Sequence, residues 1–190
     1  MNTQNKIICF VGPSGVGKTS FANLLVEKYS LTLPTVITTR QKRMDDDDRY
    51  QYVSDVDFFE MIKLNLFIEW DIYLNYYYGT LLQSIKKYRK NGVILDLTPN
   101  GCKKIIKIIP SAIIIALLPN KPAWLINRLI SRNTQSKKEI ETRTKLLESY
   151  LDEINLLDCK KVYVHFSPDS WKGTLLEIEK IIFEENIQRG

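Results

Sequence analysis

The sequence has few of the residues that build metal centres or disulfide frameworks. Its 190 residues include three cysteines, Cys9, Cys102 and Cys159, and a single histidine. The cysteines are widely spaced and none belongs to a C-x-x-C pair, so neither a structural zinc site nor a disulfide scaffold is expected. We expect three buried thiols in a reducing compartment, and therefore a cytoplasmic location.

Long hydrophobic runs and a strong charge imbalance are also missing. The longest apolar stretch, Ala112 to Leu118, is far shorter than the ~20 residues that a membrane-spanning helix needs. The first residues, MNTQNK, lack the basic start and apolar segment of a secretory signal. A net charge of +5 and a pI near 9.0 favour anionic partners only weakly. We therefore expect neither a membrane partner nor a secretory route.

Short apolar runs alternate with amphipathic segments of helical length. Strands are predicted at 6–11, 93–97, 112–118 and 161–164, and helices after residue 17 and at 100–109, 121–131, 136–157 and 170–187. Continuous apolar strands that alternate with helices are typical of a parallel sheet covered on both faces. The length fits about one domain of ~150 residues. The sequence thus predicts an α/β fold with three α/β/α layers and a mainly parallel central sheet.

Residues 35–80 have a different composition, rich in tyrosine, aspartate and threonine. Short strand-like pieces at 50–53 and 67–70 flank a helical segment at 55–64. Because this stretch lies between the first helix and the second core strand, it predicts a small lobe inserted into the domain.

Residues Gly12 to Thr19 (GPSGVGKT) match the phosphate-loop pattern G-x-x-x-x-G-K-[ST], with a buried strand before and an amphipathic helix after. In such a loop, backbone N–H groups and a helix N-terminus bind phosphate oxygens. We expect Lys18 to reach the β- and γ-phosphates of a nucleoside triphosphate, and Thr19 to bind Mg²⁺ together with Asp96, which lies near the end of its strand. The expected nucleotide-binding residues are Gly12, Ser14, Gly15, Val16, Gly17, Lys18, Thr19 and Ser20.

The phosphate loop is followed by TTR-x-x-R at 38–43, YQYVS at 50–54, FIEW at 67–70 and NYYYGT at 75–80. In this order the motifs resemble guanylate kinases, and the resemblance runs from about residue 6 to about residue 165. It implies transfer of the γ-phosphate of ATP to GMP or dGMP by a monomer or homodimer. It also implies one domain with a nucleotide core (1–34, 81–127 and 146–190), a monophosphate-binding lobe (35–80) and a mobile lid (128–145).

The resemblance assigns roles to side chains on the acceptor side. Arg40 and Arg43 lie three residues apart and would clamp the acceptor phosphate, since guanidinium groups bind phosphate in bidentate fashion. Glu69 would read the N1–H and exocyclic amine of guanine. The further acceptor-side residues are Asp46, Tyr50, Tyr78, Thr80 and Asp96.

Three arginines are expected over the triphosphate. Arg128 and Arg132 lie four residues apart on a predicted helix and therefore share one face, and Arg143 follows in the lid. With Lys18 and Arg40, the resemblance implies that these arginines act in catalysis by stabilising the transferring phosphoryl group. A plain solvated cationic helix is the alternative reading of the spacing.

Several positions depart from the family pattern. Val36 stands where a serine usually contacts the guanine carbonyl, and Thr98 where an acidic residue usually follows Asp96. Four consecutive aspartates, Asp45 to Asp48, replace a Gly-Glu pair, so Asp46 stands in for the glutamate or belongs to a solvated turn. Near the end, His165 and Phe166 replace an Asn-Asp pair. The departures leave open weakened or shifted base specificity.

Other functions remain open at this point. A kinase on the same scaffold would act on another phosphorylated acceptor, and a non-catalytic interaction module would use the fold for binding alone. The intact Lys18 and Thr19 argue against the module. The basic run Lys86 to Lys90 is typical of a solvated helix face, so no nucleic-acid partner is expected.

Overall fold

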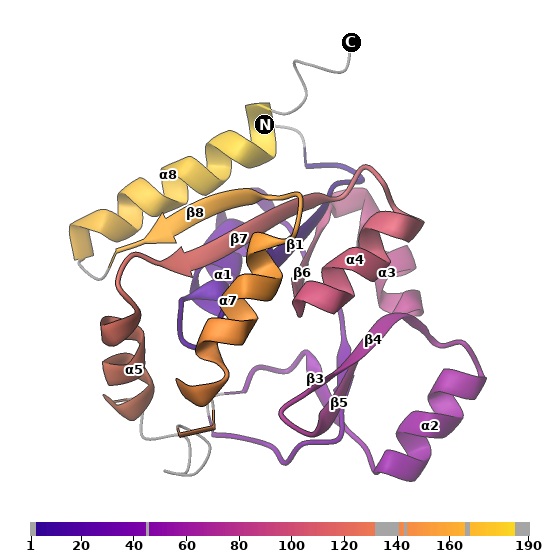
Figure 1. Ribbon diagram of the computed structural model, residues 1–190. Coiled ribbons are helices and arrows are strands. Elements are labelled where there is room, and N and C mark those ends of the chain that lie inside the picture. The colour runs from indigo at the N-terminus through magenta and orange to yellow at the C-terminus, as the bar shows by residue number, and fades with distance from the viewer. Residues whose placement is uncertain (1–2, 45, 132–140, 143, 166–167, 185–190) are drawn as a thin grey trace.

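The computed structural model describes residues 3–44, 46–131, 141–142, 144–165 and 168–184. Two four-stranded sheets organise these residues. The first contains the four strands predicted for the central sheet, and the second is formed by the segment between the first helix and the second strand of the central sheet (Figure 1).

The central sheet has the strand order β6-β1-β7-β8 and every pairing in it is parallel. Its strands are β1 (Ile7–Val11), β6 (Val93–Leu97), β7 (Ile113–Pro119) and β8 (Lys160–Val164). All residues of β1 and β7 are buried, because helices cover both faces of the sheet. The four strands predicted from continuous apolar runs are confirmed, each to within one residue at either end.

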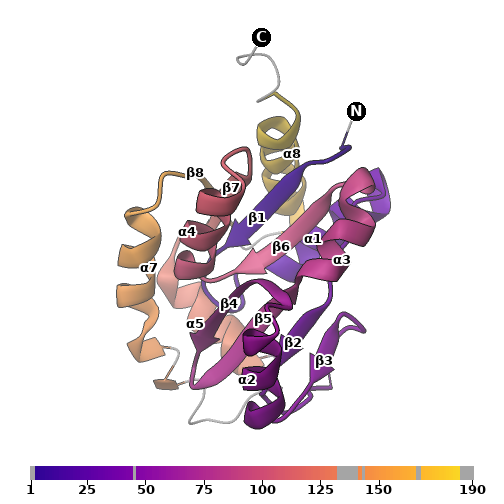
Figure 2. The same ribbon diagram turned by 90° about the vertical axis from the view of Figure 1, so that its right-hand side faces the viewer.

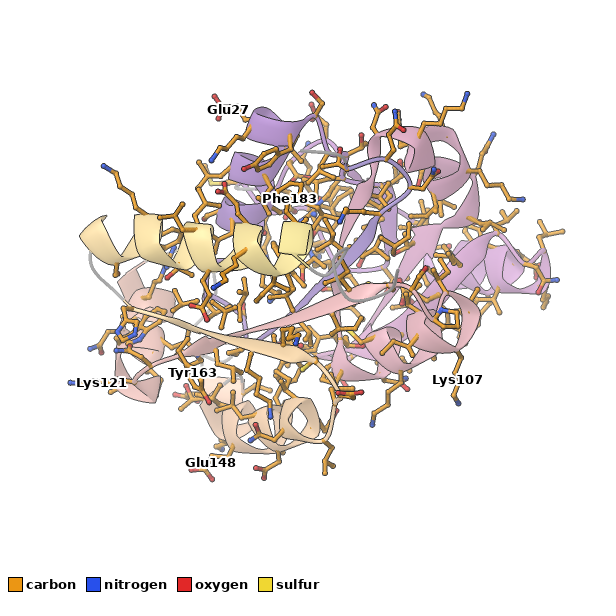
Figure 3. The ribbon with its side chains drawn as sticks, turned by 90° about the horizontal axis from the view of Figure 1, so that it is seen from above. Glu27, Lys107, Lys121, Glu148, Tyr163 and Phe183 are labelled. Atoms are coloured by element: carbon orange, nitrogen blue, oxygen red, sulfur yellow. The ribbon has the colours of Figure 1, made fainter. Side chains whose placement is uncertain are left out.

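Helices form the two outer layers. Their bounds are α1 (Lys18–Tyr29), α3 (Leu82–Tyr88), α4 (Pro99–Ile108), α5 (Pro122–Ser131), α7 (Leu147–Asn155) and α8 (Pro168–Glu184), with a short 3₁₀ turn at Arg89–Asn91. Figure 3 shows Glu27 of α1 and Phe183 of α8 on one side of the sheet, and Lys107 of α4 and Glu148 of α7 on the other. The three-layer α/β/α prediction is therefore confirmed.

Alternate residues of β1 point into two separate apolar clusters. Ile8 and Phe10 pack with residues of α1, α5 and α8, whereas Cys9 packs with residues of α3, α4 and α7. Cys9 and Cys102 are buried free thiols as expected, but Cys159 is only half-buried. Burial in the apolar layer raises the pKa of both buried thiols.

The second sheet has the order β3-β2-β5-β4, from β2 (Val36–Thr38), β3 (Tyr50–Tyr52), β4 (Phe67–Tyr73) and β5 (Tyr76–Leu81). It lies with α2 (Asp55–Lys63) beside one end of the core (Figures 1 and 2). Ser54 caps α2 by accepting a hydrogen bond from the Asp57 amide, and Phe58 is buried against Phe67, with ring centroids 4.7 Å apart. The predicted strands at 50–53 and 67–70 and the helix at 55–64 are confirmed. Two strands, β2 and β5, were not predicted.

Two neighbouring chain segments join the second sheet to the core. The Leu81 amide donates to the Thr35 carbonyl (3.1 Å), and the Thr35 amide donates to Ser84 Oγ (3.1 Å). Thr32 bridges to Val93 of β6. The incoming and outgoing connections are thus hydrogen-bonded to each other and to the central sheet, so they fix where the acceptor-side motifs lie relative to the phosphate loop.

One predicted helix differs from the structure. The continuous helix expected at 136–157 lies partly outside the described residues, and the described part is interrupted by a turn at Leu146 before α7. The remaining predicted helices agree with α4, α5 and α8 to within about three residues. Within the described ranges no helix has the length and apolar character to cross a membrane.

Candidate active site

The phosphate loop connects the end of β1 to the first residue of α1. Gly17 has φ 113°, a left-handed conformation that favours glycine, and brings no side chain to cap the first amides of α1. A Cβ at Gly12 would lie 2.3 Å from the Leu117 carbonyl oxygen, so the loop crosses β7 at a distance that only glycine permits. The unpaired amides of a helix N-terminus are a site for an anion.

Tryptophan and phenylalanine rings support the loop from behind. Trp171 of α8 stacks on Phe21 of α1 with ring centroids 4.4 Å apart, and a Cβ at Gly17 would lie 2.9 Å from the Trp171 ring. The Arg128 guanidinium lies over the Trp171 ring at 5.2 Å from its centroid. The C-terminal helix therefore forms part of the wall behind the nucleotide-binding motif.

Lys18 and Asp96 face each other across the floor of the site. Lys18 Nζ donates to the Gly12 carbonyl (2.6 Å) and lies 3.7 Å from Asp96 Oδ1. Asp96 is held on β6 directly beside Phe10 of β1. The Thr19 hydroxyl and the Asp96 carboxylate line the same cavity, and oxygen donors of these two kinds suit Mg²⁺.

One cavity of about 230 Å³ joins the phosphate loop to the second sheet. The predicted residues along it are Gly12, Ser14, Gly15, Gly17, Lys18, Thr19, Ser20, Arg40, Arg43, Asp46, Tyr50, Glu69, Tyr78, Thr80, Asp96 and Arg128. Val16 is the exception among the expected nucleotide-binding residues. Its side chain is fully buried, and its amide donates to the Pro13 carbonyl at 3.3 Å.

Arg40 is held by a buried bidentate ion pair. Its Nη1 and Nη2 donate to the two carboxylate oxygens of Asp46 at 2.6 and 2.5 Å, and the two side chains are 5% and 8% exposed. Asp46 also accepts from Tyr52 Oη (2.6 Å) and from the Arg43 amide (2.7 Å). Burial opposes ionisation of this carboxyl, but the hydrogen bonds from Arg40, Tyr52 and Arg43 lower its pKa to about 2. The buried and paired carboxylate of Asp46 does not fit a solvated turn, and its replacement of the family's glutamate stays a prediction.

Glu69 is buried at the other end of the cavity. Its Oε1 accepts a hydrogen bond from Thr80 Oγ1 at 2.6 Å, and the residue is 7% exposed. Burial raises the pKa of this carboxyl, and the hydrogen bond from Thr80 opposes that rise. A buried carboxylate with one oxygen paired suits a ligand that presents N–H donors.

Asp71 lies two residues beyond Glu69 on β4, and its carboxylate also lines the cavity. Asp71 accepts hydrogen bonds from Thr98 Oγ1 and from Asn100 Nδ2, the latter at 2.9 Å, and Lys104 Nζ lies 3.9 Å away. This part of the site therefore has a carboxylate, that of Asp71, although residue 98 is a threonine. Thr98 orients this carboxylate, which comes from the second sheet.

The remaining departures have different outcomes. Val36 of β2 lines the cavity beside Thr80, its partner on β5, so an apolar side chain stands where the family pattern has a hydroxyl. His165 Nδ1 lies 2.7 Å from Asn120 Nδ2. Arg132, Arg143, Asp45 and Phe166 lie outside the described residues, so of the predicted lid arginines only Arg128 is placed, at the cavity wall.

Sequence reasoning missed Arg49 and Asp71, which both line the cavity. For Asp71 a signal was present, because side chains two apart on a strand share a face and Glu69 was already assigned to the site. For Arg49 the signal was weaker. It follows an acidic run that is typical of a turn, and the roles assigned in this stretch went to Arg43, Asp46 and Tyr50.

Comparisons with known proteins agree with this geometry. The family model described as guanylate kinase matches residues 4–160. A guanylate kinase of Mycoplasma mobile is 36% identical over 154 residues, covering 75% of this chain and 77% of its own. One of Mycoplasma genitalium is 32% identical over 194 residues, covering 98% of this chain and 79% of its own.

A solved structure supports the same fold. The crystal structure of guanylate kinase from Anaplasma phagocytophilum superposes with a TM-score of 0.74 at 18% identity, covering 100% of this chain and 90% of that one. The family model and the sequence similarity agree with the phosphate loop, the acceptor-side motifs and the fold. The chain belongs to the guanylate kinase family.

Proposed function

We propose that the protein transfers the γ-phosphate of ATP to GMP or dGMP, giving ADP and the nucleoside diphosphate. The observation that carries this proposal is the cavity that joins the phosphate loop to the buried Glu69 of β4 and to several arginines of the connection between β2 and β3. Transfer between two polyanions requires alignment and charge neutralisation more than covalent chemistry from the protein. A cavity with phosphate-binding groups on both sides supplies both requirements.

On the donor side, the amides at the start of α1 and Lys18 would hold the β- and γ-phosphates. The Lys18 ammonium, which lies on the Gly12 carbonyl, would turn towards the phosphates when they arrive. Thr19 and Asp96 would hold Mg²⁺, which neutralises phosphate charge when bound. Arg128 would add positive charge from the wall, and Arg132 and Arg143 from the lid proposed at 128–145.

On the acceptor side, the lobe proposed at 35–80 would bind the monophosphate. Arg43, Tyr50 and Tyr78 line the cavity where the acceptor phosphate would lie. Arg40 would face the same phosphate, with Asp46 fixing its orientation. The two phosphates would then meet in front of Lys18, and exclusion of water there would favour transfer over hydrolysis.

The base would be read by carboxylates. Glu69 would accept from the N1–H and exocyclic amine of guanine, a donor pair that adenine does not present, and Thr80 holds it in place. Asp71 would supply the second carboxylate that position 98 lacks, on the same face of β4. With Val36 beside them, the guanine carbonyl would receive no hydroxyl from β2.

A coupled assay that follows ADP formation across a panel of nucleoside monophosphates tests the proposal. We expect turnover with GMP and dGMP to exceed that with AMP, CMP and UMP. Turnover with another phosphorylated acceptor but not with GMP would favour a different kinase on this scaffold. An absence of turnover with every acceptor would favour an interaction module. We expect activity in the cytoplasm, with a monomer or homodimer as the active form.

A further inference from the structure

Arg49 is a buried arginine that the assigned roles do not use. The residue is 9% exposed and its side chain 6% exposed, although it lies in the cavity wall. Its carbonyl accepts a hydrogen bond from the Val36 amide at 2.9 Å, which fixes its backbone at the start of β3. A guanidinium placed this deeply requires anionic or acceptor groups around it.

The hydrogen bonds of Arg49 are incomplete among the described residues. Its Nη2 donates to Tyr50 Oη at 3.2 Å, and its guanidinium lies over the Tyr50 ring at 5.0 Å. Its Nε lies 3.2 Å from Asp47 Oδ1 but donates no hydrogen bond to it, so the buried Nε–H has no acceptor in the described structure. Since buried N–H groups are nearly always paired, this donor indicates a ligand.

Arg40 provides the contrast. Both of its terminal nitrogens donate to Asp46, and Nη1 also donates to the Gln41 carbonyl at 2.9 Å. Arg40 and Arg49 flank the same ring, since the Arg40 guanidinium lies 4.9 Å from the Tyr50 centroid. Of these two arginines, Arg49 is the one that has a buried side-chain nitrogen without a hydrogen-bond acceptor among the described residues.

The cavity that Arg49 lines also contains charged groups next to the phosphate loop. Burial opposes its charge, but Tyr50, Asp96 and Asp47 raise the pKa of the guanidinium, so Asp96 lies within its electrostatic reach. Asp96 in turn lies 3.7 Å from Lys18. Arg49, Tyr50 and Lys18 line the same cavity, so Arg49 shares one space with the acceptor-side tyrosine and with the lysine of the phosphate loop.

We propose that Arg49 binds the phosphate of the acceptor, a nucleoside monophosphate dianion, and donates its Nε–H to one of the phosphate oxygens. This inference rests on the proposed kinase function and adds a specificity-determining group to it. Arg43 and Arg49 would hold the dianion directly. Arg40, with Asp46, would act as a fixed positive charge behind them.

The test compares Arg49→Met and Arg49→Lys with the wild-type protein, and uses Lys63→Met as the control. Lys63 belongs to α2, its side chain is 69% exposed, and it forms an ion pair with Glu60 of the same helix. Steady-state kinetics give KM for GMP and for ATP, and calorimetry gives Kd for GMP and for guanosine, which lacks the phosphate. Thermal melting checks the fold of each variant.

A charge-assisted hydrogen bond to phosphate predicts that Arg49→Met raises KM and Kd for GMP by about 10- to 100-fold. KM for ATP and Kd for guanosine should change less than about twofold, and Lys63→Met should match the wild type. Arg49→Lys keeps the positive charge but loses the planar guanidinium with its several N–H donors. Its rise in KM and Kd for GMP should therefore be intermediate. If Arg49→Met does not fold, the same comparison of GMP with guanosine in Arg49→Lys decides.

Two results would overturn the inference. One is an unchanged GMP affinity in both Arg49 variants, and the other is an equal loss of GMP and guanosine affinity, which indicates a structural role. Either result leaves the proposed function intact as long as the wild-type protein phosphorylates GMP. A wild-type protein without GMP turnover would instead refute the proposed function itself.

Discussion

Replacement of Asp46 by asparagine should destabilise the protein by a predictable amount. The pKa of Asp46 falls from the ordinary value of 3.8 to about 2 because Arg40, Tyr52 and the Arg43 amide favour its ionised form over the cost of burial. Each tenfold change in proton affinity is equivalent to 1.36 kcal/mol, so the ionised carboxylate contributes about 2 kcal/mol. Asparagine keeps the shape but not the charge, and should lose about that much.

The sign of the pH dependence distinguishes this cause from a packing defect. A carboxyl whose pKa is lowered by folding stabilises the native state above its unfolded pKa and loses that effect as the pH falls through its folded value. The difference between wild type and Asp46→Asn should therefore be about 2 kcal/mol at pH 7 and shrink towards zero between pH 4 and pH 2. Urea unfolding over this range measures it, and thermal melting at pH 7 should show a fall of about 4–8 °C.

Asp48→Asn is the matched control, because Asp48 is an exposed carboxylate in the same turn. Its unfolding free energy should follow that of the wild type within about 0.5 kcal/mol at every pH. A difference for Asp46→Asn that stays constant from pH 7 to pH 2 would refute the electrostatic reasoning, and so would no difference at pH 7.

The remaining predictions concern the two substrates. Lys18→Ala should lower kcat by about a hundredfold or more with an unchanged melting temperature, and near-normal turnover would contradict the donor-side assignment. Glu69→Gln should raise Kd for GMP by about 10- to 100-fold and leave Kd for an ATP analogue unchanged, whereas equal effects on both would argue against base reading. Asp71→Asn should raise KM for GMP by about tenfold, which an unaltered KM would disprove. Val36→Ser should tighten GMP binding by about fivefold in calorimetry, and no change would mean that another group already contacts the guanine carbonyl.

The central sheet was predictable because its strands are buried on both faces. Such strands read as continuous apolar runs, as VILDL at 93–97 shows, and they stand out from their surroundings. The missed strands β2 and β5 lack that signal. The first has only three residues, and the second is a run of tyrosines whose pairing with β2 and β4 depends on distant parts of the chain.

The same distinction applies to the site. The phosphate loop is a contiguous pattern, and its meaning is local. The ion pair between Arg40 and Asp46, the hydrogen bond from Thr98 to Asp71 and the buried position of Arg49 depend on how the second sheet folds against the first. A comparison of single positions counts Thr98 as a lost acid, because it does not detect a carboxylate supplied from another strand.

The stacking of Trp171 on Phe21 makes the phosphate loop, near the start of the sequence, dependent on α8, near its end. The family model ends at residue 160, before α8 begins at Pro168. During synthesis, the phosphate loop would leave the ribosome more than a hundred residues before Trp171, whose ring packs behind it, emerges from the exit tunnel. A chain that ends at Val164 would keep every motif recognised in the sequence. It would still lack the Trp171 ring that packs behind the phosphate loop.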